Sequence, residues 1–262
     1  MNAHSSDLAA YEALLAFWHE AGVDACYLDE PIDHTVIQPL PTPAAVQKLA
    51  AVQPVRAPAG QTRVDAGVPL ARQLAAQANT LDELIGAVAA FDGCGLKMMG
   101  AKNALFGRGA ADADLLVIAD APTGEDDDRN QPFSGPSARL LERILGAAGV
   151  AEKTYLTQTV FWQPPGNRPP TPEEQAVCLP FIERAVQLIQ PKAVLLIGAV
   201  AVRGILSSQE SLLRLQGRWQ EWTPHGHETL PVMTTFHPGF LLQQPLAKGA
   251  VWRDMLAVAA RL

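Results

Sequence analysis

The chain has 262 residues, 48% of them hydrophobic, and a formal net charge of −7 from 20 basic and 27 acidic side chains. This length and apolar content suffice for one large domain with a substantial core. The net charge lends no support to a nucleic-acid binder held mainly by bulk positive charge, but it allows a local basic groove on an acidic body.

The N-terminal third predicts helices joined by an irregular connector. Apolar residues recur at helical spacing over 7–21, whereas 31–66 is rich in Pro, Ala and Gln. Two further helices are expected over 68–78 and 81–91, the second with Thr80 as N-cap and Glu83 three positions on. We therefore predict a helical N-terminal extension over 1–85 and a second domain over 86–262.

The second domain alternates continuous apolar strands with helices. This pattern predicts an α/β fold, a three-layer αβα sandwich around a central, mostly parallel four-stranded sheet. Thr171 and Pro172 predict the start of one of the helices, and residues 214–223 predict an antiparallel excursion. The expected strands are 114–121, 154–162, 193–198 and 232–238, and the expected helices are 136–147, 171–189, 199–206 and 247–261.

The cysteines and the polar N-terminus predict a cytoplasmic protein. Cys26, Cys94 and Cys178 are odd in number and far apart, which indicates reduced thiols. The first residues, MNAHSSD, lack a secretory pattern, and the longest apolar runs are too short for a membrane span. No membrane association is expected.

The most informative residues follow the predicted strands, because ligands of such sheets bind beyond the strands' carboxyl ends. Asp120 ends the first strand, where it could hold a water, act as a base, or simply cap its own turn. His237 ends the last strand, where a lone histidine can equally be structural. It has no metal-ligand partner at suitable spacing, so no metal site is expected.

The acidic segment GEDDDRNQPFSG leaves several alternatives open. Asp126, Asp127 and Asp128 are typical of a solvated loop, and Phe133 is typical of a core aromatic residue. Ser134 and Gly135 precede a helix, where free amides could bind a phosphate or the serine could serve as an ordinary cap. The stiff loop PPGNRPPTPEE at 164–174 is a suitable scaffold for holding a ligand.

Five segments, in order over about residues 88–262, resemble motifs of the iron–sulfur branch, family 4, of the uracil-DNA glycosylase superfamily. They are CGLKMMGAKNALFGRG, ADAPTGEDDDRNQPFSGPSARLLERIL, TYLTQTVFWQPPGNRPPTPEE, CLPFIERAVQLIQPKAVLLIGAVAV and TFHPGFLLQQP. The resemblance implies a uracil-DNA glycosylase-like fold. It also implies an enzyme that flips uracil, or a related deaminated base, out of DNA and hydrolyses its N-glycosidic bond, leaving an abasic site.

The resemblance also implies a role for each motif residue. Asp120, Asp126 and His237 are the expected catalytic groups, with His237 donating to the uracil O2 as charge builds on the departing base. Phe133 is expected to stack on the base and Gln158 to read its edge, beside Ala119 and Ala121. The residues expected to contact DNA are Ser134, Gly166, Asn167, Arg168, Gly239 and two wedge candidates, Leu241 and Leu242.

The sequence departs from the family at the cluster ligands. Cys94 and Cys178 match two of the four cysteines, whereas Phe91 and Trp162 stand at the other two positions. A cuboidal cluster needs four such ligands. We therefore expect no cluster and no other cofactor, with the aromatic rings filling the vacated space.

Two departures concern the pocket and leave two hypotheses open. Gln158 stands where the family has asparagine, and Asp120 where it has glutamate. The first hypothesis is an active, monofunctional glycosylase. The second is a damaged-base or abasic-site binding protein on the same fold. A nucleotide-using metabolic enzyme is less favoured, because no phosphate-loop motif is present. The expected partner is single- or double-stranded DNA with uracil or related lesions. The protein is expected to be a monomer in a bacterial-type cytoplasm, associated with the nucleoid through DNA.

Overall fold

The computed structural model describes residues 61–262, with side chains from residue 67 onward. The predicted helix 7–21, most of the connector 31–66 and Cys26 lie outside the described residues. The predicted boundary near residue 85 falls inside a helix, Leu81–Ala90, and it stays a prediction. The described residues, 61–262, belong to one compact unit.

A single six-stranded sheet forms the centre of this unit, in the order β1-β3-β2-β4-β6-β5. The four inner strands are mutually parallel, which confirms the predicted parallel sheet. The outer strands, β1 and β5, are antiparallel to their neighbours; β5 belongs to the predicted excursion, whereas β1 was not predicted. The strands are β1 Gly107–Gly109, β2 Leu115–Ala119, β3 Thr154–Gln158, β4 Ala193–Ile197, β5 Trp219–Trp222 and β6 Leu230–Thr235.

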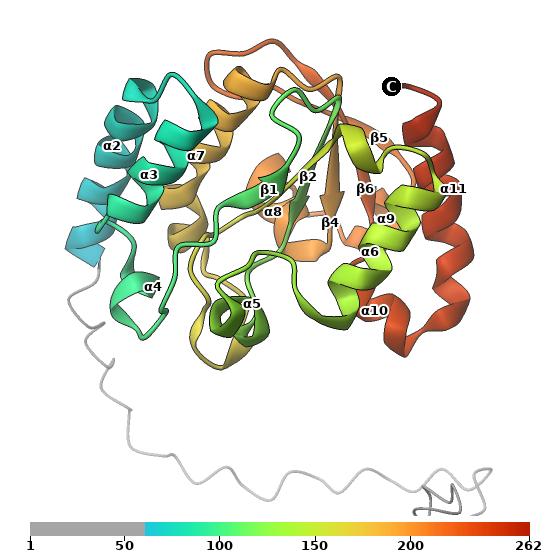
Figure 1. The fold of residues 1–262 in the computed structure, drawn as a ribbon, viewed down its shortest axis with the longest axis horizontal. Coiled ribbons are helices and arrows are strands. Elements are labelled where there is room, and N and C mark those ends of the chain that lie inside the picture. The colour runs from blue at the N-terminus through green and yellow to red at the C-terminus, as the bar shows by residue number, and fades with distance from the viewer. Residues whose placement is uncertain (1–60) are drawn as a thin grey trace, which may run out of the picture. The chain divides into compact units, whose positions relative to one another are not determined.

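Helices cover both faces of the sheet, as Figure 1 shows, with α2, α3 and α7 on one side and α6, α10 and α11 on the other. Among residues 61–262, no helix is both long enough and apolar enough to cross a bilayer. The helices are α2 Gln61–Gln77, α3 Leu81–Ala90, α4 Gly95–Met98, α5 Gly124–Arg129, α6 Gly135–Ala147, α7 Pro172–Ile189, α8 Ala199–Leu206, α9 Leu212–Leu215, α10 Pro238–Gln243 and α11 Lys248–Ala259, with 3-10 turns η1 Ala151–Lys153, η2 Pro165–Asn167 and η3 Pro245–Ala247.

Side chains of the inner strands alternate between two hydrophobic cores, because successive strand residues face opposite sides of a sheet. Leu116 and Ile118 of β2 pack with the α7 and α8 side. Leu115, Val117 and Ala119 pack with the α6 and α11 side. Every residue of β2, β3 and β4 is buried, as expected for strands covered on both faces.

Two predicted helix starts are confirmed by their hydrogen bonds. The Thr80 side chain accepts a hydrogen bond from the Glu83 amide at the start of α3. Thr171 and Glu174 form a reciprocal capping box at the start of α7. Each such cap satisfies an amide that the helix itself leaves unpaired, and is worth about 1 kcal/mol.

Candidate active site

A pocket opens at the carboxyl ends of the four parallel strands. The alternation of the strands places Ala119, Gln158, Ile197 and His237 on the same side of the sheet, facing α6. Residues from the acidic segment and from α6 close the other side. The predicted site residues that line this pocket are Ala119, Ala121, Asp126, Phe133, Ser134, Gln158 and His237.

Gln158 places an unsatisfied amide in this pocket. The side chain is only 3% exposed, and its Oε1 atom is buried without a hydrogen-bond partner in the described part of the chain. Buried polar atoms are nearly always paired, because leaving one unpaired costs free energy. The free Oε1 can therefore accept a hydrogen bond from a donor that enters the pocket.

His237 has a defined proton arrangement. It is the N-cap of α10, and its Nδ1 atom accepts a hydrogen bond from the Gly239 amide at 3.1 Å. An Nδ1 that accepts leaves the proton of the neutral ring on Nε2. Burial lowers the pKa of His237, against the opposing charges of Asp120 and Asp126. The ring is therefore a neutral donor through Nε2.

Asp120 lies on the opposite side of β2 from Ala119 and is tied to the start of α8. Its Oδ1 atom accepts hydrogen bonds from the Val200 amide at 3.1 Å and the Ala201 amide at 2.9 Å. Its Oδ2 atom has no hydrogen-bond partner among residues 61–262. Burial raises the pKa of Asp120, against the hydrogen bond from the Ala201 amide, which favours the carboxylate. One oxygen is thus anchored and the other is unpaired within residues 61–262, and Asp120 is not among the residues that line the pocket.

Phe133 forms one wall of the pocket in an unusual backbone conformation. Its ring is buried, and its φ of +59° lies in the left-handed region, which residues with a Cβ seldom adopt. The Arg108 side chain donates to the carbonyl oxygens of Pro132 at 3.0 Å and Phe133 at 3.1 Å. The wall is therefore held from β1.

Both oxygens of the Asp126 carboxylate accept hydrogen bonds from nearby residues. Oδ2 accepts from the Thr123 amide and hydroxyl, both at 2.8 Å, and Oδ1 accepts from the Ser134 amide. Together with the bond from the Asp126 amide to Thr123, these contacts form the capping box of α5. Asp126 lines the pocket, but its hydrogen bonds go to the backbone and side chain of neighbouring residues and hold the pocket wall in place.

The alternative of a solvated acidic loop was wrong for Asp126 and Asp127, which are both buried. The segment is the short helix α5, and Asp127 is only 3% exposed. Its carboxylate accepts hydrogen bonds from the Lys102 and Asn103 amides, which ties the chain before β1 to α5. Asp128 is exposed, as expected, and forms an ion pair with Lys102, while the exposed Glu125 forms an ion pair with Arg129.

The 165–168 loop is held against α5 and α7 and does not line the pocket. Gly166 and Asn167 both have positive φ. The Asn167 Oδ1 atom accepts from the Gly124 amide at 2.9 Å. Arg168 makes a two-pronged ion pair with Glu174, at 2.9 and 2.6 Å. In this structure its guanidinium therefore stabilises the start of α7.

The remaining predicted DNA contacts lie at the start of α6 and along α10. Ser134 precedes α6 without capping it, because its hydroxyl donates to the Gln131 carbonyl. Gly239 supplies the amide that fixes His237. Leu241 is completely buried, whereas Leu242 is 47% exposed, so Leu242 is the wedge candidate that the structure leaves accessible.

The four positions that correspond to the cluster ligands gather in the core beside α7. Phe91 lies 6.3 Å from Trp162 and 5.3 Å from Phe181 between ring centroids, and both Phe91 and Trp162 are 1% exposed. The Cys178 thiol donates to Cys94 and lowers the pKa of Cys94, while burial raises the pKa of Cys178. These residues do not fit a four-thiolate cluster, because two of the four positions are filled by rings.

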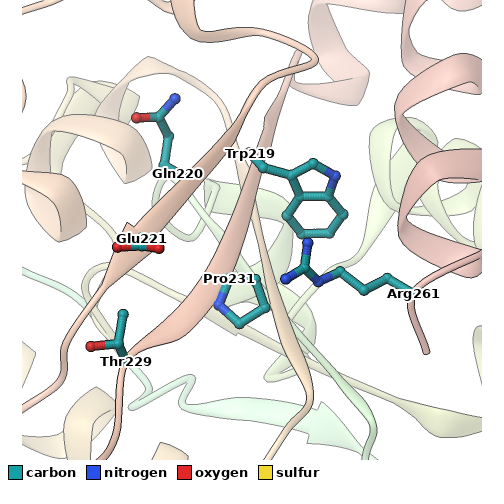
Figure 2. Close-up of a pocket in the computed structure, with 6 residues that line it drawn as sticks. All are labelled: Trp219, Gln220, Glu221, Thr229, Pro231 and Arg261. Atoms are coloured by element: carbon teal, nitrogen blue, oxygen red, sulfur yellow. The ribbon is translucent and has the colours of Figure 1, made fainter.

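A second hollow lies over β5 and the start of β6. Figure 2 shows Arg261 beside the Trp219 ring there. The guanidinium carbon lies 4.6 Å from the ring centroid. This hollow is at the edge of the sheet and contains none of the predicted site residues. The pocket at the strand ends is therefore the candidate active site.

Comparison with known proteins identifies the family. The family model described as the uracil DNA glycosylase superfamily matches residues 106–256. The chain belongs to this superfamily. It is 32% identical over 143 residues to a type-4 uracil-DNA glycosylase of Thermotoga maritima. The aligned region covers 54% of this chain and 72% of the relative.

Two archaeal type-4 uracil-DNA glycosylases give similar matches. The protein of Saccharolobus solfataricus is 28% identical over 167 residues, 62% of this chain and 77% of the relative. That of Pyrobaculum aerophilum is 26% identical over 159 residues, 59% and 81% respectively. Within the superfamily, this uracil-DNA glycosylase homologue belongs with the type-4 branch.

Sequence reasoning missed several residues of the glycosylase pocket. Thr123, Ser137 and Pro238 line it, and Arg108 supports it from β1. Thr123 and Asp126 carry the spacing of a capping box, and that signal could have predicted α5. No sequence signal pointed to Arg108, since its strand is only three residues long.

Proposed function

We propose that this protein is a monofunctional DNA repair glycosylase that flips uracil out of DNA and hydrolyses the bond between the base and C1′. The observation that carries the proposal is the buried Gln158 Oε1, which has no partner in the part of the chain that the structure describes, in a pocket that also holds a neutral His237. Uracil presents an N3–H donor beside the O4 acceptor, which a glutamine amide can match with its own acceptor and donor.

The wall and the donor account for binding and for leaving-group stabilisation. The Phe133 ring would stack on the face of the flipped base. The His237 Nε2–H would donate to the uracil O2 while the electron pair of the C1′–N1 bond moves onto the base. A donor aimed at developing charge in a site of low water content is worth more than in bulk water.

Asp120 would act on the sugar side. Its Oδ1 is anchored by the Val200 and Ala201 amides, so Oδ2 is the oxygen that can accept a hydrogen bond from a water. That water would attack C1′ as positive charge develops on the sugar, and the carboxylate charge would stabilise that cation. The products are free uracil and an abasic site.

The surface around the pocket would face the DNA. We assign Ser134, Gly166 and Gly239 to the phosphate-facing backbone and Leu242 to the duplex wedge. Asn167 and Arg168 would fix the loop in place, in keeping with their contacts to Gly124 and Glu174. The proposed substrates are single- and double-stranded uracil DNA, bound by a monomer at the nucleoid in the cytoplasm.

Single-turnover release of uracil from a labelled oligonucleotide tests this function. We expect release by the native protein and loss of most of it in His237→Asn, which keeps an N-cap acceptor for Gly239. The same assay on oligonucleotides that carry hypoxanthine or a thymine mismatch in place of uracil measures the base selectivity. Tight binding to uracil DNA without release by the native protein would overturn the proposal in favour of a binding protein.

We also propose that the protein works without an iron–sulfur cluster. The packing of Phe91 against Trp162 and Phe181 supports this, because these rings fill the same buried core that contains both cysteines. We expect colourless, iron-free protein after anaerobic purification. The double variant Phe91→Cys with Trp162→Cys restores four thiols, and we expect it to take up iron and sulfide on reconstitution while either single variant does not. Iron in the native protein would contradict the proposal.

A further inference from the structure

The short strand β1 brings one arginine across the sheet toward the pocket wall. Arg108 pairs with Leu156 of β3, whose side chain belongs to the pocket-side core. Gly107 and Gly109 flank it, and a Cβ at either position would collide with a β3 carbonyl oxygen. The two glycines thus let β1 approach closely enough for Arg108 to reach over β3.

The Arg108 guanidinium grips two consecutive carbonyl groups. Nε donates to the Pro132 oxygen at 3.0 Å, and Nη2 donates to the Phe133 oxygen at 3.1 Å. Nη2 also forms an ion pair with Glu142 of α6, which fixes the orientation of the guanidinium. A planar guanidinium with fixed donor directions restrains both peptide groups at once.

The gripped segment is the one with the unfavourable backbone. Phe133 has φ of +59°, and the adjacent Ser134 amide is held from the other side by Asp126. Residues in sparsely populated conformations persist only when their surroundings over-determine them. Without Arg108, the Pro132–Phe133 peptides would lose two of the donors that hold them.

We propose that Arg108 is a positioning residue that holds the Phe133 ring in place as the base-stacking wall. The inference rests on the proposed function for its catalytic consequence, but the clamp itself is a property of the free protein. Arg108 acts through Phe133 and touches no reacting atom. Its effect should therefore concern binding of a flipped base and the chemical step, with no effect on attraction to the DNA backbone.

The test compares Arg108→Met with Arg108→Lys and a matched control, Arg143→Met. Arg143 lies next to Glu142 on α6 and has no hydrogen bond or ion pair in the described structure, so its loss removes the same charge without touching the clamp. We expect Arg108→Met to lower the single-turnover rate about a hundredfold, as a misplacement of about 1 Å does. Arg108→Lys should recover part of this loss, and Arg143→Met should match the native rate.

Two readouts separate the clamp from a general structural role and from failure of the proposed function. Affinity for abasic-site DNA, which has no base to stack, should stay within twofold of native, while affinity for uncleavable 2′-fluoro-deoxyuridine DNA falls. Hydrogen exchange needs no DNA: Arg108→Met should lose amide protection over residues 131–136 alone. Unchanged exchange there, or equal loss of affinity for both DNAs, overturns the proposal.

Discussion

Replacing the unpaired amide of Gln158 should stabilise the protein while removing its activity. Gln158 is 3% exposed, and its Oε1 has no hydrogen-bond partner among residues 61–262. A buried acceptor without a donor costs about 1–3 kcal/mol relative to its hydrated state in the unfolded chain. Gln158→Met keeps the length of the side chain and removes this cost. For a unit of this size, such a gain raises Tm by roughly 3–10 °C.

Thermal unfolding and single-turnover uracil release measure the two effects on the same preparation. The matched control is Gln175→Met, because Gln175 is also buried but donates from Nε2 to the Val200 carbonyl at 3.1 Å. We expect the control to lower Tm and Gln158→Met to raise it. If both variants lower Tm, Gln158 Oε1 is satisfied in the free protein, for example by an ordered water, and is not left free for a ligand.

Three further predictions concern the acid side of the pH–rate profile, the aromatic core around Phe91 and the wedge candidate Leu242. Uracil release should persist as pH falls through about 6.5, the ordinary pKa of histidine, because burial lowers the pKa of His237. Since this pKa is lower in the native protein than in the unfolded chain, the free energy of unfolding should also decline below that pH. A pH–rate profile that loses activity already above pH 6.5 would contradict this. Phe91→Ala should cost about 3–5 kcal/mol in urea unfolding, and a cost below about 1 kcal/mol would show that the ring does not fill the core. Leu242→Ala should slow release from duplex DNA more than from single strands at unchanged Tm, whereas the buried Leu241→Ala should cost about 2–5 kcal/mol; equal effects on both substrates would remove Leu242 as the wedge.

The inner sheet could be predicted because its strands carry their own signal. Continuous apolar runs such as LLVIA and AVLLI are typical of strands covered on both faces, and both were located to within a few residues. The edge strand β1 carries no such signal, since two of its three residues are glycines whose role is close approach to β3. Tertiary contact, which sequence periodicity does not report, decides that strand.

The site was predictable where position along a strand fixes direction. The ends of β2, β3 and β6 brought Ala119, Gln158 and His237 to one pocket, as the parallel arrangement requires. Asp127 was not predictable, because an acid within an acidic run is usually solvated and only the fold supplies the Lys102 and Asn103 amides that it accepts from. The hydrogen bonds of Asp126 likewise depend on how α5 meets the start of α6.

The hydrogen bond between His237 and the Gly239 amide makes loss of catalysis compatible with an intact fold. The same nitrogen that sets the tautomer also starts α10, the helix that carries Leu242. Asparagine, aspartate or serine at this position could still cap the helix and would leave the DNA-facing surface in place. A single substitution could therefore turn this enzyme into a stable lesion-binding protein, so natural relatives that have lost the histidine should still fold and still recognise DNA.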